Sequence, residues 1–373
     1  MHLVDDHCHP FSLTHTPLEL DRITLDAREG PEEDARRRRL GPDRLVQELF
    51  TVRLARFFDC APEELPEVRE AAARDWPAYV RRLLDDAGIA ALIWDAATLP
   101  GAARHLADYT ALAGRPLHPL YRIDPLVDRL IEDGAGSAEI VLAVSEGLHQ
   151  ARREDAAVGA KTVLAYRTGL AVRPEVGEEE ADRSLGDRSV PVRRRGAACR
   201  ALVLRRALGV AAELDLPFQI HTGFGDSDLR LAEADPLLLE PLLRTPEGEA
   251  AQIVLLHSSY PWHEEAAYLA ATRPNVHADF SLACLFAPAT SAERLLRMLD
   301  LAPASKLLLG TDAHLTPETY WFGAHVVRAA WLETARRLQE QGVRRAWLER
   351  AERRLFFGNA IDLYGIPDPI PED

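Results

Sequence analysis

The chain has 373 residues, enough for one large hydrophobic core or two ordinary domains. Hydrophobic residues make up 47% and charged residues 28%, a balance that excludes an intrinsically disordered protein. The formal net charge of −15 argues against nucleic acid as a partner, because phosphate binding needs a basic surface. No apolar stretch reaches the roughly 18 residues of a membrane span. We therefore expect a cytoplasmic protein that acts on a small molecule, without nucleic acid or membrane as partner.

Short apolar runs recur along the chain and are separated mostly by helical patterns. Runs that are apolar almost throughout are typical of strands buried on both faces of a parallel sheet. Eight such strands alternating with helices predict a (β/α)8 barrel, the TIM-barrel architecture, as a single domain over residues 1–373. The predicted strands are 2–6, 89–96, 116–123, 159–166, 217–222, 252–257, 275–281 and 305–312.

Two segments exceed what a minimal barrel needs. Residues 10–85 separate the first two predicted strands and contain several helical patterns, so we expect a helical insertion that caps the barrel mouth. Residues 173–198 are charged and rich in residues that break helices and strands, which predicts a mobile connection.

Residues with metal-binding or acid–base chemistry occur near the ends of the predicted strands. His7 and His9 are two residues apart, so both side chains project to the same side of an extended strand. The fourth strand contains Lys161, and the fifth, sixth and eighth strands end near His221, His257 and Asp312. Active sites of (β/α)8 barrels are built at the carboxyl ends of the strands. These residues are therefore predicted to share one face of the barrel.

The residue types predict the chemistry of that face. Three histidines and Asp312 can hold one divalent metal, with Zn²⁺ preferred and Mn²⁺, Fe²⁺ or Co²⁺ as alternatives. The metal would lower the pKa of a bound water towards about 7, and Asp312 could take the proton as a general base. His257 would orient the water or stabilise charge on the substrate. With a second metal, His257 would instead become a ligand.

With His7 and His9 on the first predicted strand and Asp312 on the eighth, the sequence resembles the amidohydrolase superfamily, which carries H-x-H and Asp at these two places. The stretches "KTVLAYRTGL", "FQIHTGFGDSDLRLAEADPLLLEPLL", "IVLLHSSYPWHEEAAYLA", "NVHADFSLA" and "KLLLGTDAH" are similar to one branch of it. That branch includes the domain fused to glutamine-synthetase-like domains in fungal developmental and plant nodulin-like proteins. The resemblance is dense over residues 157–364 and is limited to the first strand before them.

The resemblance implies a standalone hydrolase whose metal is held by His7, His9, His221 and Asp312, with His257 close to the reacting centre. In members with two metals, a carboxylated lysine at the end of the fourth strand bridges them. Here "TVLAY" follows Lys161, which places this lysine too deep in the predicted strand to bridge. Its ammonium group would then hydrogen-bond a ligand or the substrate, and one required metal is favoured over two.

Two further residues are candidates for substrate binding. Arg167 should lie just past the fourth strand, where its guanidinium group could hold a substrate carboxylate or form an ion pair that fixes the loop. Tyr260 follows His257 and could line the pocket, although packing explains it equally well.

The sequence therefore predicts a metal-dependent hydrolase that cleaves an amide-like C–N bond through metal-activated water. One alternative is a metal-dependent decarboxylase, a lyase that acts on a carboxylated substrate. The other is a non-catalytic sensor or scaffold that retains the metal site. The oligomeric state stays open, with a homodimer through the 10–85 insertion as one expectation.

Overall fold

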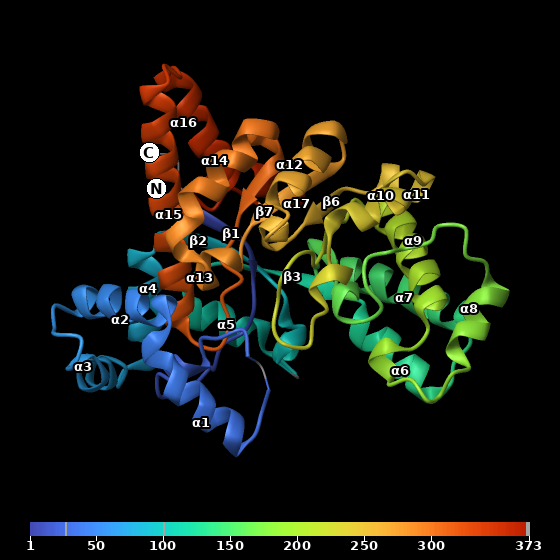
Figure 1. The fold of residues 1–373 in the computed structure, drawn as a ribbon, viewed down its shortest axis with the longest axis horizontal. Helices are drawn as coiled ribbons and strands as arrows, with labels where there is room; N and C mark the ends of the chain where they lie inside the picture. The colour runs from blue at the N-terminus through green and yellow to red at the C-terminus, as the bar shows by residue number, and fades with distance from the viewer. Residues whose placement is uncertain (27, 100, 371–373) are drawn as a thin grey trace.

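The core of the molecule is a parallel sheet of eight strands that curves into a barrel (Figure 1). The computed structural model describes residues 1–26, 28–99 and 101–370. Each strand pairs in parallel with the next in chain order, and every run predicted to be a strand contains one. The (β/α)8 barrel is therefore confirmed. The strands are β1 (Leu3–Cys8), β2 (Ile89–Trp94), β3 (Leu117–Arg122), β4 (Gly159–Thr162), β5 (Phe218–Ile220), β6 (Ile253–Leu255), β7 (Val276–Phe280) and β8 (Leu307–Leu309).

The barrel closes where the end of β1 meets the residues that follow β8. The backbone N–H of Asp312 donates to the carbonyl of His7 at 2.7 Å, and the N–H of His9 donates to the carbonyl of Ala313 at 2.8 Å. The carboxylate of Asp5 accepts hydrogen bonds from the N–H and the hydroxyl group of Thr311, at 2.8 and 2.6 Å. This seam joins three of the predicted metal ligands across some 300 residues of chain.

Side chains alternate between two apolar cores. One set points into the barrel and packs on the helix α17 (Asn359–Tyr364), which contributes Ala360 and Tyr364 to this inner core. The other set points outward and packs under the surrounding helices, with Cys8 among it. Burial on both faces explains why the strands are apolar almost throughout. The inward set from the strands is Val4, Ala91, Ile93, Leu120, Val254 and Leu308.

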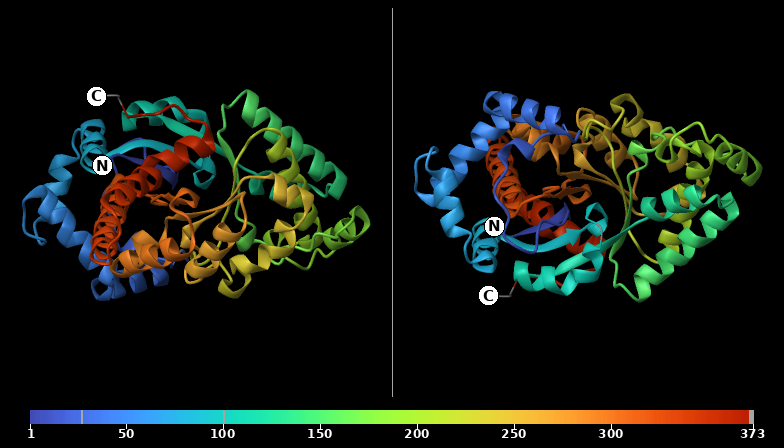
Figure 2. Two further views of the ribbon diagram at one scale, coloured as in Figure 1. Left: turned by 90° about the horizontal axis from the view of Figure 1, so that it is seen from above. Right: turned by 90° about the horizontal axis from the view of Figure 1, so that it is seen from below.

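Helices surround the sheet on its outer side (Figure 2). In the described ranges, no helix is both long and apolar enough to cross a membrane. Besides α17, the helices are α1 (Pro31–Leu40), α2 (Leu45–Phe58), α3 (Leu65–Ala72), α4 (Trp76–Asp86), α5 (Leu106–Ala113), α6 (Asp124–Asp133), α7 (Ser137–Arg153), α8 (Glu178–Leu185), α9 (Ala197–Glu213), α10 (Glu240–Leu243), α11 (Pro246–Ala250), α12 (His263–Thr272), α13 (Ala283–Phe286), α14 (Ser291–Leu301), α15 (Pro317–Glu340) and α16 (Arg345–Arg353).

The segment between β1 and β2 carries α1 to α4, which lie at one side of the barrel in Figure 1. A fully buried ion pair fastens it to α15: Arg69 Nε donates to Glu318 Oε1 at 2.8 Å. The hydroxyl group of Tyr79 donates to the same oxygen at 2.6 Å. The insertion is thereby attached to the helix that follows β8. Its role as a cap of the barrel mouth stays a prediction.

Two sequence predictions need correction. The fourth strand ends at Thr162 rather than at Tyr166, because the carboxylate of Asp124 accepts the N–H of Val163 at 2.9 Å and the Thr162 hydroxyl at 3.0 Å. Residues 164–166 then form a 3-10 turn. The segment 173–198 is also more regular than expected, because it contains α8. Its Asp182 accepts the N–H of Ser137 at the start of α7, at 2.7 Å.

Candidate metal centre and cavity

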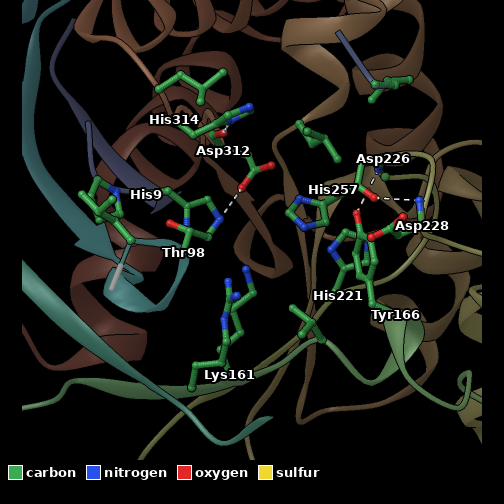
Figure 3. A pocket seen from close by; sticks show the side chains of 18 of the residues that line it. His9, Thr98, Lys161, Tyr166, His221, Asp226, Asp228, His257, Asp312 and His314 are labelled. Atoms are coloured by element: carbon green, nitrogen blue, oxygen red, sulfur yellow. Dashed lines mark hydrogen bonds and ion pairs between the residues drawn. The ribbon is translucent and has the colours of Figure 1, made fainter. Parts of the chain in front are cut away.

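Three of the predicted ligands converge at the barrel mouth. His7 Nε2 lies 3.2 Å from His9 Nε2, and both nitrogens face Asp312 Oδ1, at 3.3 and 3.1 Å. All three residues are buried, and their ligand atoms form a compact group that could hold a metal ion. Figure 3 shows the side chains of His9 and Asp312 facing each other in the lining of the cavity. The seam between β1 and β8 explains this convergence, since it fixes the backbones of all three residues.

The protonation states suit metal binding. Burial, together with the nearby ammonium group of Lys161, lowers the pKa of His7 to about 3, and burial also lowers the pKa of His9. Both imidazoles are therefore neutral at pH 7, the form that binds metals. His9 Nδ1 donates to the carbonyl of Asp95 at 3.0 Å, which leaves the lone pair of Nε2 pointing at the cluster. Burial alone would raise the pKa of Asp312, but His257, His7 and His9 hold it well below its usual range.

Lys161 lies beside this cluster and is nearer to the end of its strand than the sequence predicted. Because β4 ends at Thr162, Lys161 is one residue from the strand end, and Nζ lies 2.6 Å from His7 Nε2. The side chain is only 1% exposed. Burial lowers the pKa of Lys161 to about 8, with Asp95 opposing and Arg122 adding to the shift. The ammonium group contacts a predicted ligand, as was expected of a lysine that does not bridge two metals.

Asp95 and Arg122 complete the charge network, and sequence reasoning missed both. Asp95 Oδ2 accepts from Arg122 Nε at 2.9 Å and lies 3.2 Å from Lys161 Nζ. Although Asp95 is fully buried, Arg122 and Lys161 hold its pKa well below the usual range. Asp95 follows β2 and Arg122 ends β3, so their positions at strand ends were the available signal. Neither belongs to a histidine-rich motif that would have drawn attention to it.

The donor set fits a divalent cation. Two neutral imidazole nitrogens and one carboxylate oxygen face one another, and all three are electron-pair donors. Asp312 Oδ1 is buried without a hydrogen-bond donor, and so is His221 Nε2. The only positive group in contact with the cluster among the described residues is the Lys161 ammonium group. A site with this surplus of electron pairs attracts a cation.

His221 and His257 form a second pair rather than joining the compact cluster. Their rings lie 4.3 Å apart, and the ring of His257 is 5.6 Å from that of His7. Burial lowers the pKa of both well below the ordinary value, so both are neutral. The Ser281 hydroxyl donates to Asp279 Oδ1 at 2.9 Å, so its oxygen accepts from His257 Nδ1 at 2.9 Å, and Nε2 is left as a hydrogen-bond acceptor. Ligation by His221 stays a prediction.

Backbone strain concentrates at the same strand ends. His257 has φ 71° after β6 and Asp312 has φ 55° after β8. The left-handed region costs residues with a side chain about 1–2 kcal/mol. Leu282 after β7 and Leu315 beyond Asp312 also have positive φ angles, of 44° and 67°. Such residues persist where the surrounding structure holds them, most often at functional sites.

A cavity of about 630 Å³ opens beside the cluster and is lined by His9, Lys161, His221, His257 and Asp312. Tyr166 also lines it, and sequence reasoning missed this residue because β4 was predicted to continue through it. Its ring lies 4.8 Å from that of His221 (Figure 3). The close approach needs Gly225, because a β-carbon there would collide with the Tyr166 hydroxyl.

The two predicted substrate-binding residues have different positions. Arg167 lines the cavity, and its Nε and Nη2 both lie 2.9 Å from Asp128 Oδ2. The ion pair that was the alternative for Arg167 is therefore present. Tyr260 is not among the lining residues of this cavity: its ring packs against Phe224 and under the guanidinium group of Arg294. Packing accounts for Tyr260, which also contacts the buried group of Phe224, Leu282 and Ala283.

Comparison with known proteins identifies the family. The sequence model of the Amidohydrolase family matches residues 5–366. The chain belongs to the amidohydrolase family. The resemblance inferred from the strand-end motifs is thereby confirmed over residues 5–366, which include His7 and His9 on the first strand.

The relatives of this amidohydrolase differ in how much they share with it. It is 33% identical over 192 residues to protein fluG of Emericella nidulans, which covers 48% of this chain and 22% of fluG. The chain thus spans about a fifth of the length of that curated relative. A crystal structure from Lactobacillus casei ATCC 334, provisionally named a metal-dependent hydrolase, is 25% identical with a TM-score of 0.84, covering 97% of this chain and 95% of that one. A uronate isomerase from Thermotoga maritima is 16% identical with a TM-score of 0.69, covering 98% and 94%. At that identity the isomerase shows a common fold alone.

Proposed function

We propose that this amidohydrolase is a metal-dependent hydrolase that cleaves an amide-like C–N bond, turning an amide and water into a carboxylic acid and an amine. The observation that carries the proposal is the convergence of His7 Nε2, His9 Nε2 and Asp312 Oδ1 within 3.3 Å of one another at an open cavity. The relative from Lactobacillus casei supports hydrolysis through its name, and its similarity covers nearly the whole chain.

His7, His9 and Asp312 would hold the metal, with His221 as the fourth ligand. Imidazole nitrogens with one carboxylate oxygen favour Zn²⁺, with Mn²⁺, Fe²⁺ or Co²⁺ as alternatives. When bound, such a cation supplies Lewis acidity, which polarises the substrate carbonyl and lowers the pKa of water. One ion satisfies the compact cluster, which includes no other histidine, cysteine or carboxylate among the described residues.

The residues around the cluster have distinct roles. Asp312 is ionised, so one of its carboxylate oxygens takes a proton from the attacking water and returns it to the departing nitrogen. His257 presents an unprotonated Nε2, since Nδ1 donates to Ser281, and therefore orients the water as an acceptor rather than donating to the substrate. Lys161 supplies the positive donor for charge that develops on the carbonyl oxygen.

Metal content and turnover together test this proposal. Metal content per chain is measured by mass spectrometry for the wild type and for a His7→Ala, His9→Ala double variant, and amine release is followed on a panel of amides. We expect about one metal per wild-type chain, little in the double variant, and amine release only by the metal-loaded wild type.

The variant Asp312→Asn tests the proposed proton transfer by Asp312. Its matched control is Asp300→Asn, at an exposed residue near the end of α14. We expect Asp312→Asn to lower kcat by about 10³-fold or more, while the thermal unfolding midpoint changes little. A loaded wild type that releases CO2 from carboxylated substrates without amine would make the protein a lyase. A loaded protein with no turnover on amide, lactone and carboxylate panels would make it a sensor.

A further inference from the structure

The rim of the cavity has two unlike halves. The strands follow one another around the barrel, so the loops after β3, β4 and β5 form one side and those after β7, β8, β1 and β2 form the other. In Figure 3, Tyr166, Asp226 and Asp228 lie together on one side of His257, while His9 and Thr98 lie on the other. The side chains on these two halves differ in chemistry.

Cations dominate the half formed after β3 and β4, where two carboxylates are each shared by two basic groups. Asp95 contacts both Arg122 and Lys161. Asp128 contacts Arg167 at 2.9 Å and Arg200 at 2.7 Å. One carboxylate cannot neutralise two cations. Each set of one aspartate and two basic residues therefore keeps one net positive charge in a largely buried place.

Two acidic residues on this half, Asp226 and Asp228, offset only part of that surplus. Asp228 lies 3.5 Å from Arg193, which also lines the cavity. Asp226 accepts the N–H of Asp228 at 3.0 Å, and its carboxylate is partly buried. Both belong to the loop after β5, and neither forms an ion pair with Arg122, which ends β3, or with Arg167, which follows β4.

The opposite half carries most of the apolar side chains that line the cavity. Leu99 and Leu315 are 43% and 45% exposed although both line the cavity, and the protein core does not account for them. Leu25 and Phe286 also line the cavity, and they pack on the buried group of Phe224, Leu282 and Ala283. Apolar side chains exposed within a concave site mark a surface that a ligand covers.

We propose that the cavity selects a substrate with two unlike ends, a carboxylate on the side of Arg122 and Arg167 and an apolar group on the side of Phe286 and Leu315. The scissile amide lies between these ends, over Asp312. This substrate class rests on the proposed function, because it places the amide at the metal cluster. Arg167 binds the carboxylate with support from Arg193, and the rim leucines exclude water from the apolar end.

Matched amides test the class. N-benzoylglycine carries a carboxylate on the amine side and a phenyl ring on the acyl side, and N-phenylsuccinamate has the reverse order. The uncharged counterparts are N-propylbenzamide and N-phenylbutanamide, and N-acetylglycine and N-methylsuccinamate lack the ring. We expect kcat/KM for at least one parent to exceed that of both its counterparts by about tenfold or more, the value of one charge-assisted hydrogen bond.

Variants assign that preference to the two halves. Arg167→Gln leaves Asp128 paired with Arg200 and should bring the ratio of carboxylated to uncharged kcat/KM towards one. Arg193→Gln, at an arginine whose side chain is 64% exposed, should lower the same ratio without a risk to folding. Phe286→Ser should reduce the advantage of the ring. Arg206→Gln, on the exposed surface of α9, is the control that leaves both ratios unchanged.

Binding separates failure of this class from failure of the hydrolase assignment. Metal-free protein is titrated with ω-phenylalkanoates of increasing chain length and with the matching ω-phenylalkanols. If no amide is cleaved but an acid binds about tenfold more tightly than its alcohol, in a manner that needs both Arg167 and Phe286, the class stands and the reaction is wrong. Equal binding of acids and alcohols, or equal cleavage of charged and uncharged amides, overturns the class.

Discussion

Asp95 provides a direct test of the charge network beside the metal cluster, through the substitution Asp95→Asn. Its carboxylate contacts Arg122 and Lys161, its Oδ1 accepts the N–H of Ala97 at 3.0 Å, and its backbone carbonyl orients His9. Asparagine has nearly the same shape. The substitution therefore removes the negative charge and keeps the hydrogen bond from His9 to the backbone.

The magnitude follows from burial. Asp95 is 0% exposed and the side chain of Arg122 is 12% exposed, so two cations would be left together without an anion. Removing one partner of a buried ion pair costs about 3–5 kcal/mol of folding free energy. The unbalanced charge also opposes a divalent cation at His9, and loss of such a supporting group weakens metal binding by about 10–100-fold. We therefore expect both the unfolding free energy and the metal affinity to fall.

Two measurements check these effects separately. Urea unfolding of the metal-free protein reports the folding free energy, and competition with a chromophoric chelator reports Zn²⁺ affinity. Asp300→Asn is the control. Adding Lys161→Met to Asp95→Asn removes one of the two unpaired cations and should recover part of the lost stability, because Arg122 still lacks its anion. Metal affinity within about twofold of wild type, with the unfolding free energy unchanged, would show that Asp95 only terminates β2.

Three further predictions concern stability and the cavity wall. Burial and nearby Lys306 lower the pKa of His277 from 6.5 to about 4. Between these two pH values, His277 is therefore protonated in the unfolded chain and neutral in the folded protein. The free energy of unfolding should fall by about 3 kcal/mol through this residue as pH drops from 6.5 to 4. Urea titrations of His277→Gln should show a smaller fall over the same pH range, and an equal fall would contradict the prediction. Arg69→Met should cost about 3–5 kcal/mol by urea unfolding, and Arg69→Met with Glu318→Met should cost less, because no unpaired buried charge remains; additive losses would refute the coupling. Gly225→Ala should lower kcat/KM by about 10²-fold through displaced cavity residues, whereas Gly177→Ala, with open space at its β-carbon, should not change it.

The order of the strands could be predicted from the sequence because its cause is local. A strand buried on both faces needs an apolar run wherever it occurs, and eight runs separated by helical patterns allow a parallel barrel. The strand-end positions of His7, His9, His257 and Asp312 followed from the same runs. Family membership also depended on motifs that are contiguous in the chain, such as "KLLLGTDAH".

The tertiary structure decided what depends on partners distant in the chain. The seam between Asp5 and Thr311 brings the cluster together, and nothing near either residue in the sequence indicates it. The end of β4 was misplaced because the group that stops it, the carboxylate of Asp124, lies 38 residues before Thr162. That error hid Tyr166 and placed Lys161 too deep. The shared anions Asp95 and Asp128 were missed for the same reason. A buried carboxylate and its cations are neighbours in space but distant in the chain, and the pattern of apolar residues along the sequence does not indicate such contacts.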